Sequence, residues 1–266
     1  MVMCVLLIAT STLACAAEAR PRRIISANVC ADRLLLPLAD RADIVSVSHF
    51  AADPNLSTVA TETAGLRVNQ GDAEEIVALH PDLVILGAIQ ALSTGAMLRT
   101  LGIAVYTIPP VEGIDAVRLL IRSLAARLGQ TARGERLLAA MDARLLALPR
   151  PTHPVQAVVY QAGGWSAGRG TMADDLFGRL GFVNRAAAAG IVGFGALPLE
   201  RLVVDAPDLI VIEETGENAP SLAGALLHHP ALLRGKMRFI RIPMRLWACP
   251  DPALVEAAAL MAGAVP

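Results

Sequence analysis

Aromatic side chains are scarce in this chain of 266 residues: phenylalanine, tryptophan and tyrosine together make up 3% of it, and only two tryptophans occur. Long apolar runs are missing from its interior although 55% of the residues are hydrophobic, and a membrane-spanning helix needs about 20 consecutive apolar residues. The formal net charge is −1, so nothing favours a nucleic-acid partner. We therefore expect the bulk of the chain to be soluble and to bind something other than nucleic acid.

The common nucleotide-binding and zinc-protease motifs are also missing. The chain contains no G-x-x-x-x-G-K-[ST], G-x-G-x-x-G or H-E-x-x-H pattern. The adjacent His228 and His229 would point about 100° apart on a helix, and no C-x-x-C or Cys/His cluster has the spacing of zinc ligands. We expect neither catalytic residues nor a metal site.

Two segments of the chain repeat one design. Residues 74–86 and residues 200–212 align without a gap, because each begins with glutamate, contains Pro-Asp-Leu and ends in an apolar run. Each pattern predicts a short amphipathic helix, a proline turn and a buried strand. Many α/β proteins begin a strand in this way, which would explain one copy, but two copies 126 positions apart favour two similar lobes.

A helical block, residues 114–148, separates the two copies. Its second half, residues 131–148, repeats apolar side chains at three- and four-residue spacings and ends before Pro149. Eighteen residues of α-helix would span roughly 27 Å, enough to connect two lobes. Strands and helices alternate on both sides, which predicts an α/β fold: two Rossmann-like lobes with mainly parallel sheets, joined by one long spine helix. The expected division is a signal peptide at 1–19, an N-terminal α/β lobe at 20–113, the helical spine at 114–148 and a C-terminal α/β lobe at 149–266.

The leader predicts export to the periplasm. An apolar core at residues 2–13 is followed by Ala17-Glu18-Ala19, an A-x-A cleavage site, although no lysine or arginine precedes the core, which leaves the true start codon open. A lipid anchor at Cys15 is the less favoured alternative, because leucine lies one place too late for a lipoprotein box. The mature chain would keep Cys30 and Cys249, and an even pair in an oxidising compartment fits either a disulfide or two unpaired small apolar residues.

The most unusual loop, residues 161–171, places four glycines around one of the two tryptophans. Glycine lets a backbone approach a ligand closely and a tryptophan supplies a flat binding surface, although a tight turn with a half-buried ring is the alternative. The second tryptophan follows a predicted strand at residues 237–242, where open α/β lobes place ligands. We expect the ligand to lie between the lobes against these side chains: Trp165, Trp247, Tyr160, Asn28, His49 and Phe50.

The two Glu/Pro-Asp-Leu units, the spine, residues 23–26 (Arg-Ile-Ile-Ser) and the loop at residues 163–168 together resemble the periplasmic substrate-binding proteins of iron–siderophore, haem and cobalamin ABC importers. The resemblance covers nearly all of the mature chain. It implies a monomer with two rigidly linked lobes and a shallow cleft, which captures a metal chelate and delivers it to a dimeric ABC permease in the inner membrane. The protein would need no cofactor of its own, since iron or cobalt would arrive in the ligand. The chain differs from the common pattern at residues 26–32, where many members carry a proline and a glutamate.

The resemblance also implies roles for four further residues. Glu74 and Glu200 would be the transporter-docking points, although a glutamate in the first turn of a helix also suits the positive helix end without any partner. Cys30 and Cys249 would form a disulfide, because the C-terminal segment of such proteins returns toward the cleft. An exported α/β enzyme of unknown reaction, and a chaperone or regulatory lobe pair without transport, are the other functions that the sequence leaves open.

Overall fold

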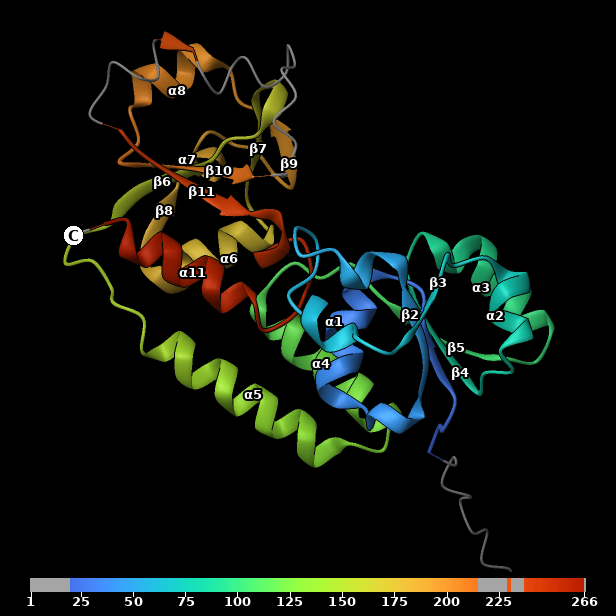
Figure 1. The fold of residues 1–266 in the computed structure, drawn as a ribbon. Helices are drawn as coiled ribbons and strands as arrows, with labels where there is room; N and C mark the ends of the chain where they lie inside the picture. The colour runs from blue at the N-terminus through green and yellow to red at the C-terminus, as the bar shows by residue number, and fades with distance from the viewer. Residues whose placement is uncertain (1–19, 215–228, 231–236, 266) are drawn as a thin grey trace, which may run out of the picture.

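The structure is a computed structural model that describes residues 20–214, 229–230 and 237–265. The leader with Cys15, His228 and the helix expected at residues 222–227 lie outside the described residues. Two α/β lobes stand side by side, and the long helix α5 runs beneath both of them (Figure 1). No helix within the described ranges is both long and apolar enough to cross a membrane.

The N-terminal lobe is a parallel five-stranded sheet with the strand order β3-β2-β1-β4-β5. Side chains alternate between its faces, so Ile24 packs under α1 and α4 while its neighbour Ile25 packs under α2 and α3. Both faces are covered, which explains why the central strands are continuously apolar. The elements are β1 (Ile24–Ser26), α1 (Val29–Leu38), β2 (Ile44–Ser48), β3 (Arg67–Asn69), α2 (Ala73–Ala78), β4 (Leu83–Gly87), α3 (Gln90–Thr100) and β5 (Ala104–Ile108).

The C-terminal lobe repeats this layering around a parallel sheet with the order β11-β10-β6-β8, to which a short antiparallel pair, β7 and β9, is added. Helices α6 and α11 cover one face of the sheet and α7 and α8 the other. The elements are β6 (Val155–Val159), β7 (Trp165–Ala167), α6 (Met172–Leu180), β8 (Phe182–Asn184), α7 (Arg185–Ala188), β9 (Phe194–Ala196), α8 (Leu199–Asp205), β10 (Leu209–Glu214), β11 (Arg238–Pro243) and α11 (Leu254–Gly263).

The spine is a helical hairpin. Helix α4 (Ile114–Arg127) turns at Gly129, whose φ is 65°, and α5 (Thr131–Leu146) runs back along it. The ion pair between Arg118 and Asp142 joins the two antiparallel helices. Helix α5 is the long helix expected from the sequence, and the predicted α/β fold is confirmed. One continuous core includes residues of both lobes, α4 and α5, so no loose linker separates the lobes.

The duplicated segments have the same local structure. His80 and Ala206, at equivalent positions just before a proline, have φ values of 50° and 39°, and they are the two non-glycine residues with positive φ in the described ranges. The following aspartates each accept hydrogen bonds from the start of the neighbouring strand: Asp82 from the Arg23 N–H at 3.0 Å, and Asp208 from the Gln156 N–H at 2.8 Å. The repeated Pro-Asp-Leu therefore fixes the register between the two central strands of each lobe.

Candidate ligand-binding site

A cavity of about 450 Å³ lies between the two lobes. In the N-terminal lobe it opens at the carboxyl ends of β1, β4 and β5, where parallel α/β sheets usually bind ligands. None of the described residues that line it carries a charge. They are Asn28, Cys30, Gly87, Ala88, Ile89, Gln90, Ile108, Pro109, Pro110, Val111, Met172, Trp247, Ala248, Cys249 and Pro250.

A second cavity of about 220 Å³ continues the cleft into the C-terminal lobe, because the two cavities share Met172, Trp247 and Ala248. Its apolar lining includes Val159 and Phe194, and its polar lining includes Gln161, Thr171 and Glu213. The ends of β6 and β10 therefore contribute to the cleft as the ends of β1 and β4 do in the other lobe. We refer to the two cavities together as the cleft.

Two amide side chains stand on the N-terminal wall of the cleft. Asn28 caps α1 by accepting a hydrogen bond from the Cys30 N–H at 3.0 Å. Its amide lies directly beside Gly87, where an added Cβ would come within 2.8 Å of Asn28 Nδ2, so a larger residue there would displace the amide. Gln90 donates from Nε2 to the Ala27 carbonyl at 2.8 Å. Both amides are thus held by the backbone at the cleft surface.

Trp247 and Glu213 form the polar centre of the C-terminal wall. The Trp247 Nε1–H donates to Glu213 Oε1 at 3.0 Å, and Gln161 Nε2 donates to Glu213 Oε2 at 3.1 Å. The indole packs against the main core while part of its surface stays in the cleft. Sequence reasoning identified Trp247 but missed Glu213 and Gln161, although both stand at strand ends, a position that could have marked them.

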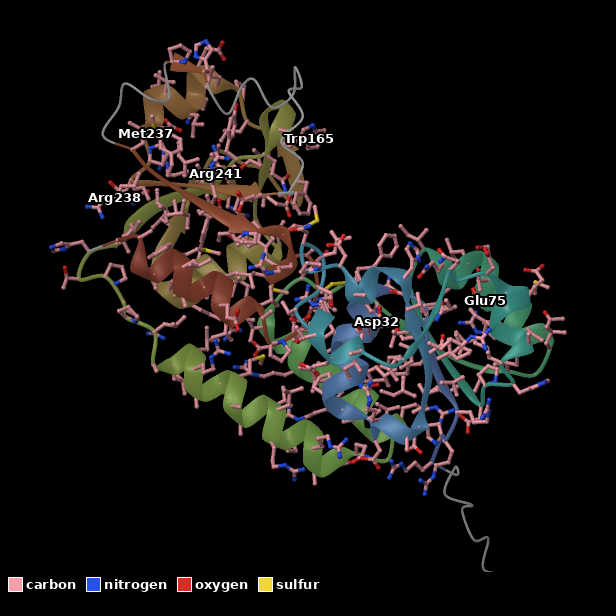
Figure 2. All side chains as sticks on the ribbon, viewed as in Figure 1. Asp32, Glu75, Trp165, Met237, Arg238 and Arg241 are labelled. Atoms are coloured by element: carbon pink, nitrogen blue, oxygen red, sulfur yellow. A yellow bond between two sulfur atoms is a disulfide. The ribbon has the colours of Figure 1, made fainter. Side chains whose placement is uncertain are left out.

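The other expected contact residues are placed differently. Trp165 is half exposed on β7 and lies outside both cavity linings; Figure 2 shows it at the edge of the C-terminal lobe, projecting away from the ribbon. His49 and Phe50 are exposed, with ring centroids 3.7 Å apart, in a turn after β2 that lines neither cavity. Tyr160 also lies outside both cavity linings: its side chain is fully buried with Val158, Leu197 and Leu202.

A covalent link and an ion pair join the lobes at the base of the cleft. The structure pairs Cys30 of α1 with Cys249 in a disulfide with a Cα–Cα distance of 5.2 Å. One turn further along α1, Arg33 pairs with Asp251, and both side chains are buried. We call these four residues the interlobe strap. Because both cysteines also line the cleft, the strap fixes its two walls relative to each other.

Glu74 and Glu200 occupy equivalent exposed positions in the first turns of α2 and α8. Within the described residues neither side chain has a hydrogen bond or ion pair assigned to it, unlike Glu75, which accepts from the Gln70 N–H at 2.8 Å. Helices α2 and α8 lie at the outer ends of the two lobes (Figure 1). Across the described ranges, no group of three or more His, Cys, Asp or Glu residues could hold a metal ion.

Two α/β lobes on a helical spine, with a cleft at their strand ends, define a bilobal solute-binding protein. The chain belongs to the periplasmic binding protein family, whose model matches residues 24–234. The family expected from the sequence is therefore confirmed.

Relatives are found by sequence and by structure. A cobalamin-binding protein of Halobacterium salinarum (strain R1) is 26% identical over 265 residues, covering 96% of this chain and 72% of the relative. The periplasmic heme-binding protein RhuT from Roseiflexus sp. RS-1, in its apo form, is 27% identical with a TM-score of 0.74, covering 91% of this chain and 97% of that one. The periplasmic vitamin B12 binding protein BtuF of Vibrio cholerae shares the fold, with 18% identity, a TM-score of 0.62 and coverage of 91% and 96%.

Proposed function

We propose that this protein is an exported solute-binding protein that captures a corrinoid, such as cobalamin, between its lobes and delivers it to an ABC importer. One observation carries the choice of ligand: the described lining of the cleft contains neutral amides, apolar side chains and one indole, with Glu213 as its single charged group. The likeness to a cobalamin-binding protein along 96% of the chain supports the same choice.

Haem fits this cleft poorly. Protein ligands to haem iron are usually His, Tyr, Cys or Met, and the described lining offers neither histidine nor tyrosine. Its two cysteines are joined to each other, which leaves Met172 alone. Haem propionates and anionic ferric chelates also favour arginine or lysine partners, which the described lining lacks, and Glu213 would repel them.

A corrinoid fits better because its rim carries carboxamide groups. Such groups both donate and accept hydrogen bonds, and Asn28, Gln90 and Gln161 present matching amides at the cleft. The flat face of Trp247 could stack on the apolar ring edge, which would contribute about 1 kcal/mol beyond simple burial. Cobalt would arrive in the ligand, so the protein needs no cofactor of its own.

The test is a titration of the purified protein with cyanocobalamin, hemin and ferrichrome, followed by thermal unfolding and tryptophan fluorescence. Cyanocobalamin should stabilise the folded state by about 2.7 kcal/mol at a hundredfold excess over Kd, and the other two should not. Stabilisation by hemin or ferrichrome alone would contradict the choice of ligand. Chromatography of the recovered ligand should show it unchanged, and its conversion would favour the exported enzyme instead.

Two tryptophan variants locate the binding surface. Trp247→Ala should weaken cyanocobalamin binding by about tenfold, since the indole is the one aromatic ring among the described residues of the first cavity. Trp165→Ala serves as the comparison, because the Trp165 ring lies outside both cavities. A loss of cyanocobalamin affinity in this variant would extend the contact surface to β7. Unchanged affinity in both variants would remove the cleft as the site.

We propose that Glu74 and Glu200 are the residues that dock to the importer. One exposed glutamate at the same place in each lobe suits a dimeric permease with one cationic pocket per subunit. Rim charges mainly control association and register, so Glu74→Arg/Glu200→Arg should leave cyanocobalamin affinity within about twofold and abolish most uptake in cells. Glu62→Arg, a reversal of another exposed glutamate of the N-terminal lobe, is the control and should retain uptake. Normal uptake by the double variant would show that these acids have another role.

Export is tested separately. If residues 1–19 are removed during export, the mature protein begins at Arg20. N-terminal sequencing of protein released from the periplasm would detect this. A lipid-modified Cys15 at the N-terminus would identify the anchored alternative.

A further inference from the structure

Glu213 is the one charged side chain among the described residues that line the cleft. Each of its carboxylate oxygens accepts one hydrogen bond, and both donors, Trp247 and Gln161, are neutral. No arginine or lysine within the described residues forms an ion pair with it. A carboxylate can accept about four hydrogen bonds, so donors from the described part of the chain fill half of its capacity.

The surroundings of Glu213 strengthen its effect on a ligand. The same cavity is lined by Val159, Ala167 and Phe194, and apolar walls strengthen the effect of a charge on any group that enters. An anionic group there would be repelled, whereas an N–H donor would gain a charge-assisted hydrogen bond. Gln161 and Trp247 hold the carboxylate from two sides, so its position is fixed before a ligand arrives.

We propose that Glu213 is the specificity-determining residue of the cleft: it accepts a hydrogen bond from a carboxamide N–H of the ligand and excludes ligands that carry a carboxylate at that place. The inference rests on the proposed corrinoid function and adds a rule of selection to it. A purely structural role is the competing explanation, in which Glu213 only orients the indole of Trp247.

The experiment compares Glu213→Gln with the unmodified protein. The substitution keeps the shape and one acceptor oxygen but removes the charge. The probes are cyanocobalamin and its monocarboxylic acid derivatives, in each of which one carboxamide is replaced by a carboxylate, titrated at pH 7.5. Dissociation constants are measured by calorimetry, and thermal unfolding checks that the variant is folded. Glu214→Gln is the matched control, because Glu214 is the next residue on β10, is exposed and lines neither cavity.

The unmodified protein should bind at least one monocarboxylic derivative about tenfold or more weakly than cyanocobalamin. Glu213→Gln should reduce that ratio to within about threefold, while Glu214→Gln leaves it unchanged. A uniform loss of affinity with an unchanged ratio would show that Glu213 only positions Trp247 and would overturn the inference, as would equal binding of all derivatives by the unmodified protein. Failure of the unmodified protein to bind any corrinoid would overturn the proposed function, and this rule of selection with it.

Discussion

Arg33 of α1 and Asp251, just before α11, form an ion pair across the two lobes in which both side chains are buried, with exposed fractions of 0% and 3%. The guanidinium Nη2 donates to Asp251 Oδ1 at 3.0 Å and Nε lies 2.5 Å from Oδ2. Asp251 Oδ1 also accepts from the Ala253 N–H at 2.8 Å, which ties the pair to the start of α11. The two residues are 218 positions apart, so the contact joins the ends of the chain.

Breaking this pair from one side should destabilise the protein strongly. In Asp251→Asn the Arg33 charge stays buried without a counter-charge, and the loss of one partner of a buried pair typically costs 3–5 kcal/mol. Urea unfolding under non-reducing conditions measures the effect. The control is Glu256→Gln, which breaks the pair between Arg144 and Glu256, with side chains 56% and 50% exposed. That variant should change the free energy of unfolding by less than about 1 kcal/mol. Equal effects in the two variants would mean that the buried pair is not a main interlobe contact.

The disulfide should contribute a separate stabilisation. It closes a loop of 219 residues, and the chain-entropy model assigns such a closure about 5 kcal/mol. Cys30→Ala/Cys249→Ala should therefore unfold at a lower urea concentration than the unmodified protein. Dithiothreitol should lower the urea midpoint of the unmodified protein to that of the double variant and leave the midpoint of the variant unchanged.

The oxidation state of the exported protein is measured directly by alkylation without reduction followed by mass spectrometry. Two unlabelled cysteines are expected in protein recovered from the periplasm. Labelling of both would show free thiols there, and Cys30 and Cys249 would then simply be small side chains of the cleft wall.

Asp32 should impose a pH dependence on stability. Its side chain, which α1 carries, is fully buried, and burial raises its pKa to about 6 from 3.8, although Ser26 and Ser48 oppose the shift by hydrogen bonding (Figure 2 labels the residue). Because the folded-state pKa lies above the unfolded one, the folded protein binds the extra proton between pH 4 and 6. Stability from this group is therefore greatest below about pH 4 and is lost as the pH rises to about 6, by roughly 3 kcal/mol in all.

Asp32→Asn should remove this component. The difference in unfolding free energy between the unmodified protein and the variant should fall as the pH is raised from 4 to 6, and then stay level. Asp40 does not interfere, because its arginine partners Arg20 and Arg133 lower its pKa to about 2. Parallel stability curves for the two proteins across this range would show that Asp32 does not titrate there.

The elements bounded by proline, glycine or polar residues could be predicted closely. In residues 74–86 and again in residues 200–212 the structure has a helix followed by a buried strand, as the sequence predicts, because Pro-Asp-Leu marks the turn and an apolar run marks the strand. The folding back of α4 on α5 could not be predicted in the same way, since it depends on which apolar stripes meet in three dimensions. The sequence marks the break at Gly129 but not its angle.

The cleft was predicted in part. Trp247 and Asn28 stand at a strand end and a helix cap, positions that the sequence identifies. Tyr160 lies outside both cavity linings; because β6 is buried on both faces, the sequence pattern alone does not show which of its residues meet the cleft. Glu213 was missed because a single glutamate at a strand end belongs to no motif, although β10 places it in the lining of the cleft.

The spine hairpin supplies the last prediction, in which one substitution should have opposite effects at two helical glycines. At Gly134 of α5, an added Cβ would lie 2.5 Å from the Ala125 Cβ of α4, so Gly134→Ala should force the helices apart and destabilise the protein by about 1–3 kcal/mol. At Gly178 of α6 an added Cβ meets nothing within 4 Å and the residue is exposed, so Gly178→Ala should stabilise by about 0.5–1 kcal/mol through helix propensity. Urea unfolding of both variants checks the signs. Stabilisation by alanine at both sites would show that α4 and α5 do not pack as closely as their contact at Gly134 requires.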